Sequence, residues 1–486
     1  MSSFVCLLSS CTDHGRDRKA WLRSTLVRDH EFLIKRDPLL VEQKFAKMAY
    51  SAYNFFRATL NLFYQDQVTS TEYRLPTQFD SPNLLNTALL GDPHIENVGT
   101  YRDLRGDIRL EFNDFDAATV GPFHFDVRRL ALSFYVAFTD KIASNQLASG
   151  LSESQLKYLV KGAVSGYVEG IREFSNDYEL AAEALRSGIS DSVVYQSLVL
   201  KAIEDGEARE ALDEYTRTAG GFRRMFYGKV EEDGSGFIND RVLETTQYEQ
   251  ELIEQVLKNY LQNNKVYKST TTNSVINEKT VVLKGTSRRY GSGVASYPLL
   301  RFYALVENMD DGSSDDVILE IKEAADPTLI PRVNYLQFPR FSENGERVSW
   351  FARKFHEVDD SDPWFGFGQF QPLSFIIRER TKFQKDFAVD KLRAGFVSGK
   401  WSLDEVWTMA NLTGRLLARS HARGRVPGSE LSFLSSINEL IQSDSDAFIN
   451  ETVDAAMILG TRLLDDYRLF HELLEEYGLL LGYSGR

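Results

Sequence analysis

Cysteine is nearly absent from this chain. Only two cysteines occur among its 486 residues, Cys6 and Cys11, and both lie close to the N-terminus. A disulfide framework and a cage of thiolate metal ligands are therefore excluded for the body of the protein. The body is compatible with a reducing compartment, and we expect a cytoplasmic protein.

Long apolar runs and an excess of positive charge are missing as well. No run approaches the ~20 apolar residues that span a bilayer, so we expect no transmembrane segment. The formal net charge of −14 argues against a surface for nucleic acid, because phosphate binding needs clustered Lys and Arg. The residues LSSC ending at Cys11 are similar to a bacterial lipid-attachment site, but the stretch before them lacks Lys and Arg. A lipid anchor at Cys11 is the minor alternative.

Apolar residues are plentiful, at 43% of the chain, and they support more than one core. The periodicity changes along the chain from helical to alternating and back to helical. We expect an α+β protein with an N-terminal extension and three further segments. The expected boundaries are 1–38 for the extension, 39–270 for loops and a helical region, 271–385 for a β-rich region, and 386–486 for returning helices.

Local patterns refine these segments. Residues 39–66 repeat apolar side chains every three to four positions and predict one amphipathic helix, and 126–264 is helical in pattern. Two stretches around GDPHIEN and IRLEFNDFD predict a strand-rich hairpin. Ser, Thr and Asn near 266–280 predict a linker. The helical face expected after residue 385 consists of Val406, Met409, Leu412, Leu416 and Leu417.

Two acidic loops carry the most informative chemistry. GDPHIEN places Asp92 and Asn97 five positions apart after an apolar run, and Asp114 and Asp116 follow the next predicted strand. Phosphoryl transfer needs an acid to orient the acceptor hydroxyl and oxygen ligands for Mg²⁺, and these loops supply both. Each Asp alone more often caps a turn, but the combination favours a catalytic and metal site. His94 is a weaker catalytic candidate, because a loop histidine is as often a scaffold.

These loops resemble a known group of enzymes. GDPHIEN followed by DFDAATVGPFHFDVRRLA is similar to the catalytic and metal loops of aminoglycoside and choline phosphotransferases. From about Arg28 to Arg423 the chain also resembles a bacterial family of kinase-like proteins, domain of unknown function 2252 (DUF2252). The resemblance implies that Asp92 orients or deprotonates the acceptor hydroxyl, that Asn97 and Asp114 bind Mg²⁺, and that buried Asp126 braces the catalytic loop. Leu90 stands where the small-molecule phosphotransferases usually have His.

The second half of the chain supplies candidates for binding ATP. Gly291, Ser292 and Gly293 form a glycine-rich turn between predicted strands that can lie over phosphates. Lys322 lies near the end of an alternating strand, as the phosphate-binding lysine of kinases does. Isolated features of this kind are usually an ordinary turn and a surface lysine, but their order along one hairpin favours the functional interpretation.

The order of these parts implies a circularly permuted, two-lobed kinase-like fold, because kinases place the glycine loop and lysine before the catalytic loop. We expect a small antiparallel β lobe and a large helical lobe. The segment LARSHARG resembles the helix that precedes the catalytic loop, so His421 and Arg423 are expected behind GDPHIEN. Glu343 and Glu346 are the candidates to pair with Lys322. The segment SFIIRERTKF is either a connector between lobes or an edge strand.

We therefore expect a phosphotransferase that uses ATP and Mg²⁺ on a small-molecule or protein hydroxyl, with the acceptor unidentified. A nucleotide-binding regulator without turnover and nucleotidyl transfer on the same scaffold stay as alternatives. A two-metal phosphoesterase is disfavoured, because the seven histidines form none of the paired motifs that such sites need.

Overall fold

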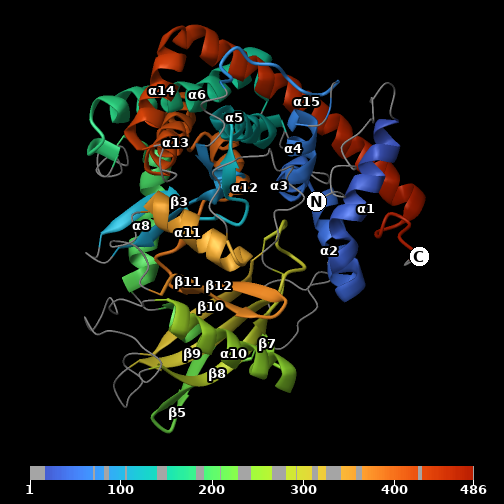
Figure 1. Ribbon diagram of the computed structural model, residues 1–486, viewed down its shortest axis with the longest axis vertical. Helices are drawn as coiled ribbons and strands as arrows, with labels where there is room; N and C mark the ends of the chain where they lie inside the picture. Colours follow the sequence, from blue (N-terminus) through green and yellow to red (C-terminus); the bar gives the residue numbers. More distant parts are fainter. Residues whose placement is uncertain are drawn as a thin grey trace, which may run out of the picture.

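The structure is a computed structural model of the chain. It describes residues 17–68, 70, 72–81, 87–103, 107–139, 150–181, 191–207, 210–227, 242–264, 281–291, 293–308, 316–324, 341–356, 364–424 and 430–484. The fold is α+β, as expected, with helices gathered in the upper part of Figure 1 and a β-sheet in the lower part. Cys6 and Cys11 lie outside the described residues. No helix within the described ranges is long and apolar enough to cross a membrane.

Four helices form the N-terminal part. They are α1 (Arg18–Arg36), α2 (Pro38–Ala49), α3 (Ala52–Ala58) and α4 (Leu60–Val68). The single helix expected over 39–66 is therefore wrong. The helical path is interrupted after α2, where Ser51 caps a new helix. The Ser51 hydroxyl accepts a hydrogen bond from the Asn54 N–H at 3.1 Å, and α3 begins there. The apolar period continues across this break, because the three helices after α1 all bury apolar side chains.

Short strands carry the two acidic loops. They are β1 (Thr87–Leu89), the 3₁₀ turn η2 (Ile95–Asn97), β2 (Val98–Arg102), β3 (Ile108–Phe112) and β4 (Thr119–Gly121). The predicted hairpin is confirmed for β2 and β3, which pair antiparallel with Val98 opposite Phe112. β1 instead pairs with β4, and β13 (Lys385–Asp386) adds a third strand beside β2. Asn97 and Asp114 thus lie at the same end of one hairpin.

Helices surround these strands in the upper part of the molecule (Figure 1). They are α5 (Phe123–Thr139), α6 (Glu153–Asn176), α8 (Val193–Glu207), α12 (Val389–Val397), α13 (Leu403–Arg423), α14 (Glu430–Gln442) and α15 (Ser445–Tyr477). The short helix α9 (Glu210–Tyr215) instead packs against the large sheet described below. Helix α5 is expected to bury one face with Leu130, Phe134 and Ala137, but it is buried on all sides, its charged residues included. The apolar face predicted from Val406 to Leu417 is confirmed, since its five residues are all buried in α13.

The closest helix contact pairs α6 with α13 and depends on two glycines. A Cβ atom at Gly166 would collide with the backbone oxygen of Asn411, and one at Gly414 would collide with that of Ala163. Both helices begin with a capping box, at Ser152 and Ser402, which fixes where each starts. The pair holds α13 in place beside β1, which precedes the Asp92 loop, and beside α5, which supports that loop.

The lower part of the molecule is one six-stranded antiparallel sheet in the order β11-β12-β10-β9-β8-β7. Its strands are β7 (Val242–Glu244), β8 (Val281–Arg289), β9 (Arg301–Asn308), β10 (Val317–Glu323), β11 (Gly366–Phe370) and β12 (Leu373–Glu379). Helices α10 (Gln247–Asn263) and α11 (Asn344–His356) contact it. β7 and α10 precede the boundary expected at residue 270, and the expected linker at 266–280 lies outside the described residues.

Two further expectations for these regions need correction. The region expected to be helical also contains a hairpin of β5 (Thr216–Ala219) and β6 (Phe222–Met225). The segment SFIIRERTKF contains β12, which lies between β11 and β10 and is not an edge strand. After β12 the chain continues to β13, which pairs with β2, so this segment connects the sheet to the loop hairpin.

Alternation along β10 gives the sheet two different faces. Leu319 and Ile321 pack with α10 in one apolar core, whereas Glu320 and Lys322 point to the opposite face. Arg301 of β9 lies directly across from Lys322 and shares that polar face. The sheet therefore turns a charged surface away from α10.

Candidate active site between the sheet and the loops

Asp126 of α5 holds the start of the Asp92 loop in place through hydrogen bonds. The Asp126 carboxylate is fully buried and accepts hydrogen bonds from the Leu90 N–H at 2.7 Å and the Gly91 N–H at 3.1 Å. His421 Nε2 lies 3.2 Å from the same carboxylate, and its Nδ1 faces the Tyr167 hydroxyl at 2.9 Å. These bonds fix the shape of the loop before Asp92.

Gly91 is required by the same turn. Its φ of 80° is a conformation that favours glycine, and a Cβ atom there would collide with the Ala117 carbonyl. Arg423, expected behind the loop with His421, instead donates to the Phe355 carbonyl at 3.3 Å and lies near Glu111. His421 is thus placed behind the Asp92 loop, as expected, through its contact with Asp126.

Asp92 itself is held by an arginine that sequence reasoning missed. Arg129 Nε donates to Asp92 Oδ1 at 2.8 Å, and the Asn97 side-chain amide donates to the Asp92 backbone carbonyl at 2.9 Å. Burial raises the pKa of the Asp92 carboxyl, although the Arg129 charge opposes this shift. The available signal was the pair of arginines in FDVRRLA, since charged residues inside an otherwise apolar helix need buried partners.

His94 lies beside Asp92 without a hydrogen bond to it. Its Nε2 is 3.7 Å from Asp92 Oδ2, and the ring is buried near Tyr53 and Phe56. Burial holds the pKa of His94 well below its usual value, and the positive charges of Arg57 and Arg129 add to this effect. At neutral pH His94 is therefore an uncharged neighbour of the acid.

The second acidic loop follows β3. Asp114 Oδ1 accepts a hydrogen bond from the Asp116 N–H at 3.1 Å, which closes a tight turn. The Asn113 N–H donates to the Asn97 carbonyl at 2.9 Å, so this loop is attached to the end of the Asp92 loop. Arg347 of α11 secures the far side, donating to the carbonyls of Asp116 and Ala118 at 2.7 Å and 2.5 Å.

Lys322 of the sheet meets this acidic loop. Its Nζ lies 2.5 Å from Asp116 Oδ2 and 3.6 Å from Asp114 Oδ2. Burial favours a higher pKa for both acids, but at Asp114 the Lys322 charge, the hydrogen bond from the Asp116 N–H and the nearby arginine charges together lower the pKa. At Asp116, burial and the neighbouring Asp114 charge prevail and raise the pKa. The structure thus brings together two regions that are far apart in the sequence.

Arginines extend the charged face around Lys322. Arg301 and Arg378 bind the two oxygens of buried Glu320 at 3.0 Å and 2.7 Å. Burial alone would raise the pKa of Glu320, but the Arg378 and Arg301 charges hold it well below its usual value. Three cations from three adjacent strands therefore face the acidic loop. The sequence marked Arg378 only as part of the possible connector SFIIRERTKF and did not mark Arg301, because only the strand pairing reveals that they share a face with Lys322.

The candidate glutamates for Lys322 bind other groups. Glu343 accepts from the Ser374 hydroxyl at 2.7 Å, and Glu346 accepts from the N–H and hydroxyl of Ser342 at 2.8 Å and 2.7 Å. Both acids thus satisfy donors at or beside the start of α11. The expected pairing of either one with Lys322 is not present, and Lys322 contacts Asp114 and Asp116 instead.

The glycine turn lies between β8 and β9. Gly291 and Gly293 have positive φ values of 77° and 75°, whereas Ser292 lies outside the described residues. The chain just after the turn is attached to α2, where Lys44 Nζ donates to the Ala295 carbonyl at 3.0 Å. Arg301 also donates a hydrogen bond to the Ser296 hydroxyl at 3.3 Å. This bond connects the chain just after the turn to the charged face of the sheet.

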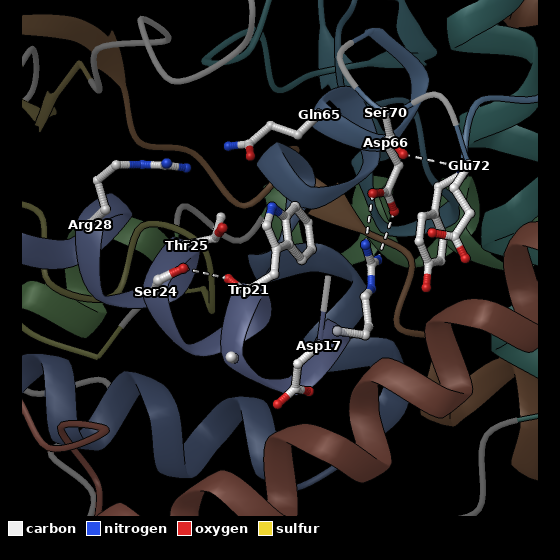
Figure 2. Close-up of a pocket in the computed structure, with 12 residues that line it drawn as sticks. Asp17, Trp21, Ser24, Thr25, Arg28, Gln65, Asp66, Ser70 and Glu72 are labelled. Atoms are coloured by element: carbon white, nitrogen blue, oxygen red, sulfur yellow. Dashed lines mark hydrogen bonds and ion pairs between the residues drawn. The ribbon is translucent and has the colours of Figure 1, made fainter. Parts of the chain in front are cut away.

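A separate cavity of about 440 Å³ lies between α1 and α4, and none of the predicted site residues lines it (Figure 2). Arg18 lines this cavity, and its guanidinium lies 4.1 Å from the ring centre of Trp21 and 4.2 Å from that of Tyr73. The same guanidinium binds Asp66 of α4 and Asp466 of α15. The Arg18 charge is therefore paired with two carboxylates of the protein itself.

The fold and the site together define an α+β protein in which loop acids meet the basic face of an antiparallel sheet. The chain belongs to the family described as an uncharacterized protein conserved in bacteria (DUF2252), whose model matches residues 36–473. The resemblance to this family is confirmed, and the match begins slightly later and continues further than expected from the sequence. No curated protein and no solved structure matches the chain.

Proposed function

We propose that this protein is a Mg-ATP-dependent phosphotransferase, which transfers the terminal phosphoryl group of ATP to a hydroxyl of a small molecule or protein. The observation that carries the proposal is the meeting of Lys322 with Asp114 and Asp116. Kinases use a strand lysine and a metal-binding aspartate on the same triphosphate. In this proposal the fold is kinase-like and circularly permuted, because the glycine turn and Lys322 follow the catalytic loop.

The basic face of the sheet is the proposed phosphate site. Lys322 is free to exchange its carboxylate partners for phosphate oxygens, and Arg301 and Arg378 lie beside it. Guanidinium groups suit phosphate because their donors form a planar fork. Gly291 and Gly293 supply a backbone that can approach phosphates closely, and their turn is attached to Arg301 through Ser296.

The loop acids suit Mg²⁺, which takes one or two protein carboxylates and completes its shell with phosphates and water. Asp116 Oδ1 is buried and has no hydrogen-bond partner in the described part of the chain, so it is a ready ligand. Asn97 uses its amide nitrogen on the Asp92 carbonyl, which leaves its oxygen as the atom for a cation. The described residues hold no group of three or more His, Cys, Asp or Glu side chains around one point, so a site made of protein ligands alone is not expected. When bound, Mg²⁺ would neutralise charge on the phosphates.

Asp92 is the proposed general base. The acceptor oxygen forms a bond to the terminal phosphorus while the bond from that phosphorus to the bridging oxygen breaks, and ADP leaves with those electrons. The proton of the acceptor hydroxyl passes to Asp92, whose pKa is raised by burial despite Arg129. Asp126 and His421 hold the loop, so that the Asp92 carboxylate keeps a fixed direction.

A regulator that binds nucleotide without turnover is the second candidate. The observation that favours it is the position of Glu343 and Glu346, which bind serines and do not pair with Lys322. Active protein kinases need that lysine–glutamate pair. Nucleotidyl transfer on the same scaffold differs only in which phosphorus is attacked.

The test is Mg-ATP binding by calorimetry, with and without EDTA, followed by ³¹P NMR on mixtures with hydroxyl and amine metabolites. We expect Mg²⁺-dependent binding and release of ADP. Asp114→Asn should abolish the Mg²⁺-dependent part with nearly unchanged thermal midpoint, while exposed Asp465→Asn serves as the matched control. Binding without turnover would support the regulator, and pyrophosphate release would support nucleotidyl transfer. Unchanged Mg-ATP affinity in Asp114→Asn would contradict the metal site.

A further inference from the structure

Arg57 at the end of α3 reaches the catalytic loop from a side that the sequence motifs do not cover. Its Nη1 lies 2.5 Å from Oε2 of Glu96, which belongs to the turn η2 four residues after Asp92. The other oxygen of Glu96 accepts a hydrogen bond from the Val389 N–H at 2.8 Å, at the start of α12. Glu96 is therefore fixed at both oxygens and gives Arg57 a defined direction.

The guanidinium of Arg57 lies near both acidic loops. Burial lowers the pKa of Arg57, but the negative charges of Glu96, Asp92 and Asp114 outweigh it and raise the pKa. Arg57 in turn opposes the upward pKa shift of Asp92. Its side chain is 21% exposed, so Arg57 is not fully enclosed by the protein. Arg57 thus lies close enough to both acidic loops for its charge to interact with Asp92, the proposed base, and with Asp114, the proposed metal ligand.

The hydrogen bonds of this region are incomplete. Arg57 Nε and Arg129 Nη1 are buried and have no partner among the described residues, although the other groups of Arg129 bind Asp92 and the Phe56 carbonyl. A buried guanidinium N–H without a partner is costly and is a sign of a missing acceptor. Phe56 directly precedes Arg57 in the chain. Its carbonyl therefore connects the backbone beside Arg57 to Arg129, the arginine that binds Asp92.

We propose that Arg57 is a further catalytic residue, which binds the phosphoryl group during its transfer and stabilises the charge on its outer oxygens. This inference rests on the proposed function. An arginine supplied by the same chain does this in some nucleotide hydrolases, where such a contact is worth roughly 10³-fold or more in rate. Glu96 is a positioning residue for Arg57. In this proposal Lys322 binds phosphate oxygens on the nucleotide side of the transferred group, and Arg57 binds oxygens of that group on the acceptor side.

The test uses Mg-ATP with water as the acceptor, so that no acceptor has to be known. Single-turnover hydrolysis and Mg-ATP affinity are measured for the wild type, Arg57→Ala, Arg57→Lys and the control Arg468→Ala, whose side chain is 69% exposed. We expect Arg57→Ala to lower the hydrolysis rate by about 100-fold or more with Mg-ATP affinity within about threefold. Added guanidinium chloride at millimolar concentration should restore part of the rate.

Arg57→Lys separates catalysis from folding. Lysine keeps the charge and can keep the ion pair with Glu96, so a structural role predicts full recovery of the rate. A catalytic role predicts a rate still lowered at least tenfold, because the planar fork is lost. Hydrolysis at the wild-type rate in Arg57→Ala, or full recovery in Arg57→Lys, would overturn the inference. Absence of Mg-ATP binding in the wild type would instead overturn the proposed function, and this inference with it.

Discussion

Replacing Lys322 by Met should change the affinities for metal and nucleotide in opposite directions. In the structure Lys322 Nζ occupies the position between Asp116 Oδ2, at 2.5 Å, and Asp114 Oδ2, at 3.6 Å. A cation at that position competes with Mg²⁺ for the same carboxylates. On the proposed function the same amine must move to the phosphates when Mg-ATP binds. The variant therefore removes a competitor for the metal and a ligand for the nucleotide.

The magnitudes follow from these contacts. Unit charges about 4 Å apart near a protein surface interact by about 4 kcal/mol, and exposure reduces this value. Because the Asp114 side chain is 40% exposed, we take about 1.4 kcal/mol, so Lys322→Met should bind Mg²⁺ alone about tenfold more tightly. A charge-assisted contact to phosphate is worth about 1.5–3 kcal/mol, so Mg-ATP affinity should fall roughly tenfold or more.

Titration calorimetry with MgCl₂ alone and then with ATP at saturating Mg²⁺ measures both effects. Lys35→Met is the matched control, because the Lys35 side chain is 61% exposed and forms an ion pair with Glu31 one turn earlier in the same helix. A loss of affinity for Mg²⁺ alone in Lys322→Met would refute the competition between lysine and metal. Unchanged Mg-ATP affinity would show that the sheet face does not bind the triphosphate.

Two further predictions concern stability. Asp126→Ala leaves the Leu90 and Gly91 amides and His421 without their acceptor, so the free energy of unfolding should fall by about 3–5 kcal/mol and both amides should lose protection in hydrogen exchange. Unaltered protection would contradict the brace. Burial lowers the pKa of Lys44 to about 8. Above this value the folded protein has released a proton that the unfolded chain still binds. The stability of the wild type relative to Lys44→Met should therefore rise between about pH 8 and 10.5, by about 3 kcal/mol, in urea unfolding curves. A flat difference across this range would show that burial does not lower the pKa of Lys44 in the folded protein.

Local patterns in the sequence predicted the β2–β3 hairpin and the buried face of α13, but not the break between the N-terminal helices. The β2–β3 hairpin and the α13 face follow from alternation and helical period, which report burial directly. The break between α2 and α3 does not, because apolar spacing continues through it and only the Ser51 cap marks the new start. The β5–β6 hairpin was missed because the charged, polar composition around it is also typical of an exposed helix.

Long-range pairing accounts for most of what the sequence could not predict in the site. Lys322 was expected to pair with Glu343 or Glu346, at the start of α11, but both acids have nearby serine donors and accept hydrogen bonds from them. Arg57 lies in no recognised motif, and the arginine pair that includes Arg129 does not reveal its partner, because the loop that each arginine reaches is fixed only by folding. The glycine turn is a feature of one segment, whereas its attachment to α2 depends on the position of Lys44.

The charges of the candidate site are nearly balanced before any ligand arrives. Asp92 faces Arg129 and lies near Arg57, whereas Asp114 and Asp116 share Lys322. These cations come from α3, α5 and β10, so each acid is compensated by an element other than its own. A Mg²⁺ ion alone would have to displace Lys322, and ATP alone would meet the negative loop acids. When both arrive, the acids can take the metal and the released lysine can take phosphate. Neither ligand has to enter the site against an uncompensated charge, so binding of metal and nucleotide should each favour the other.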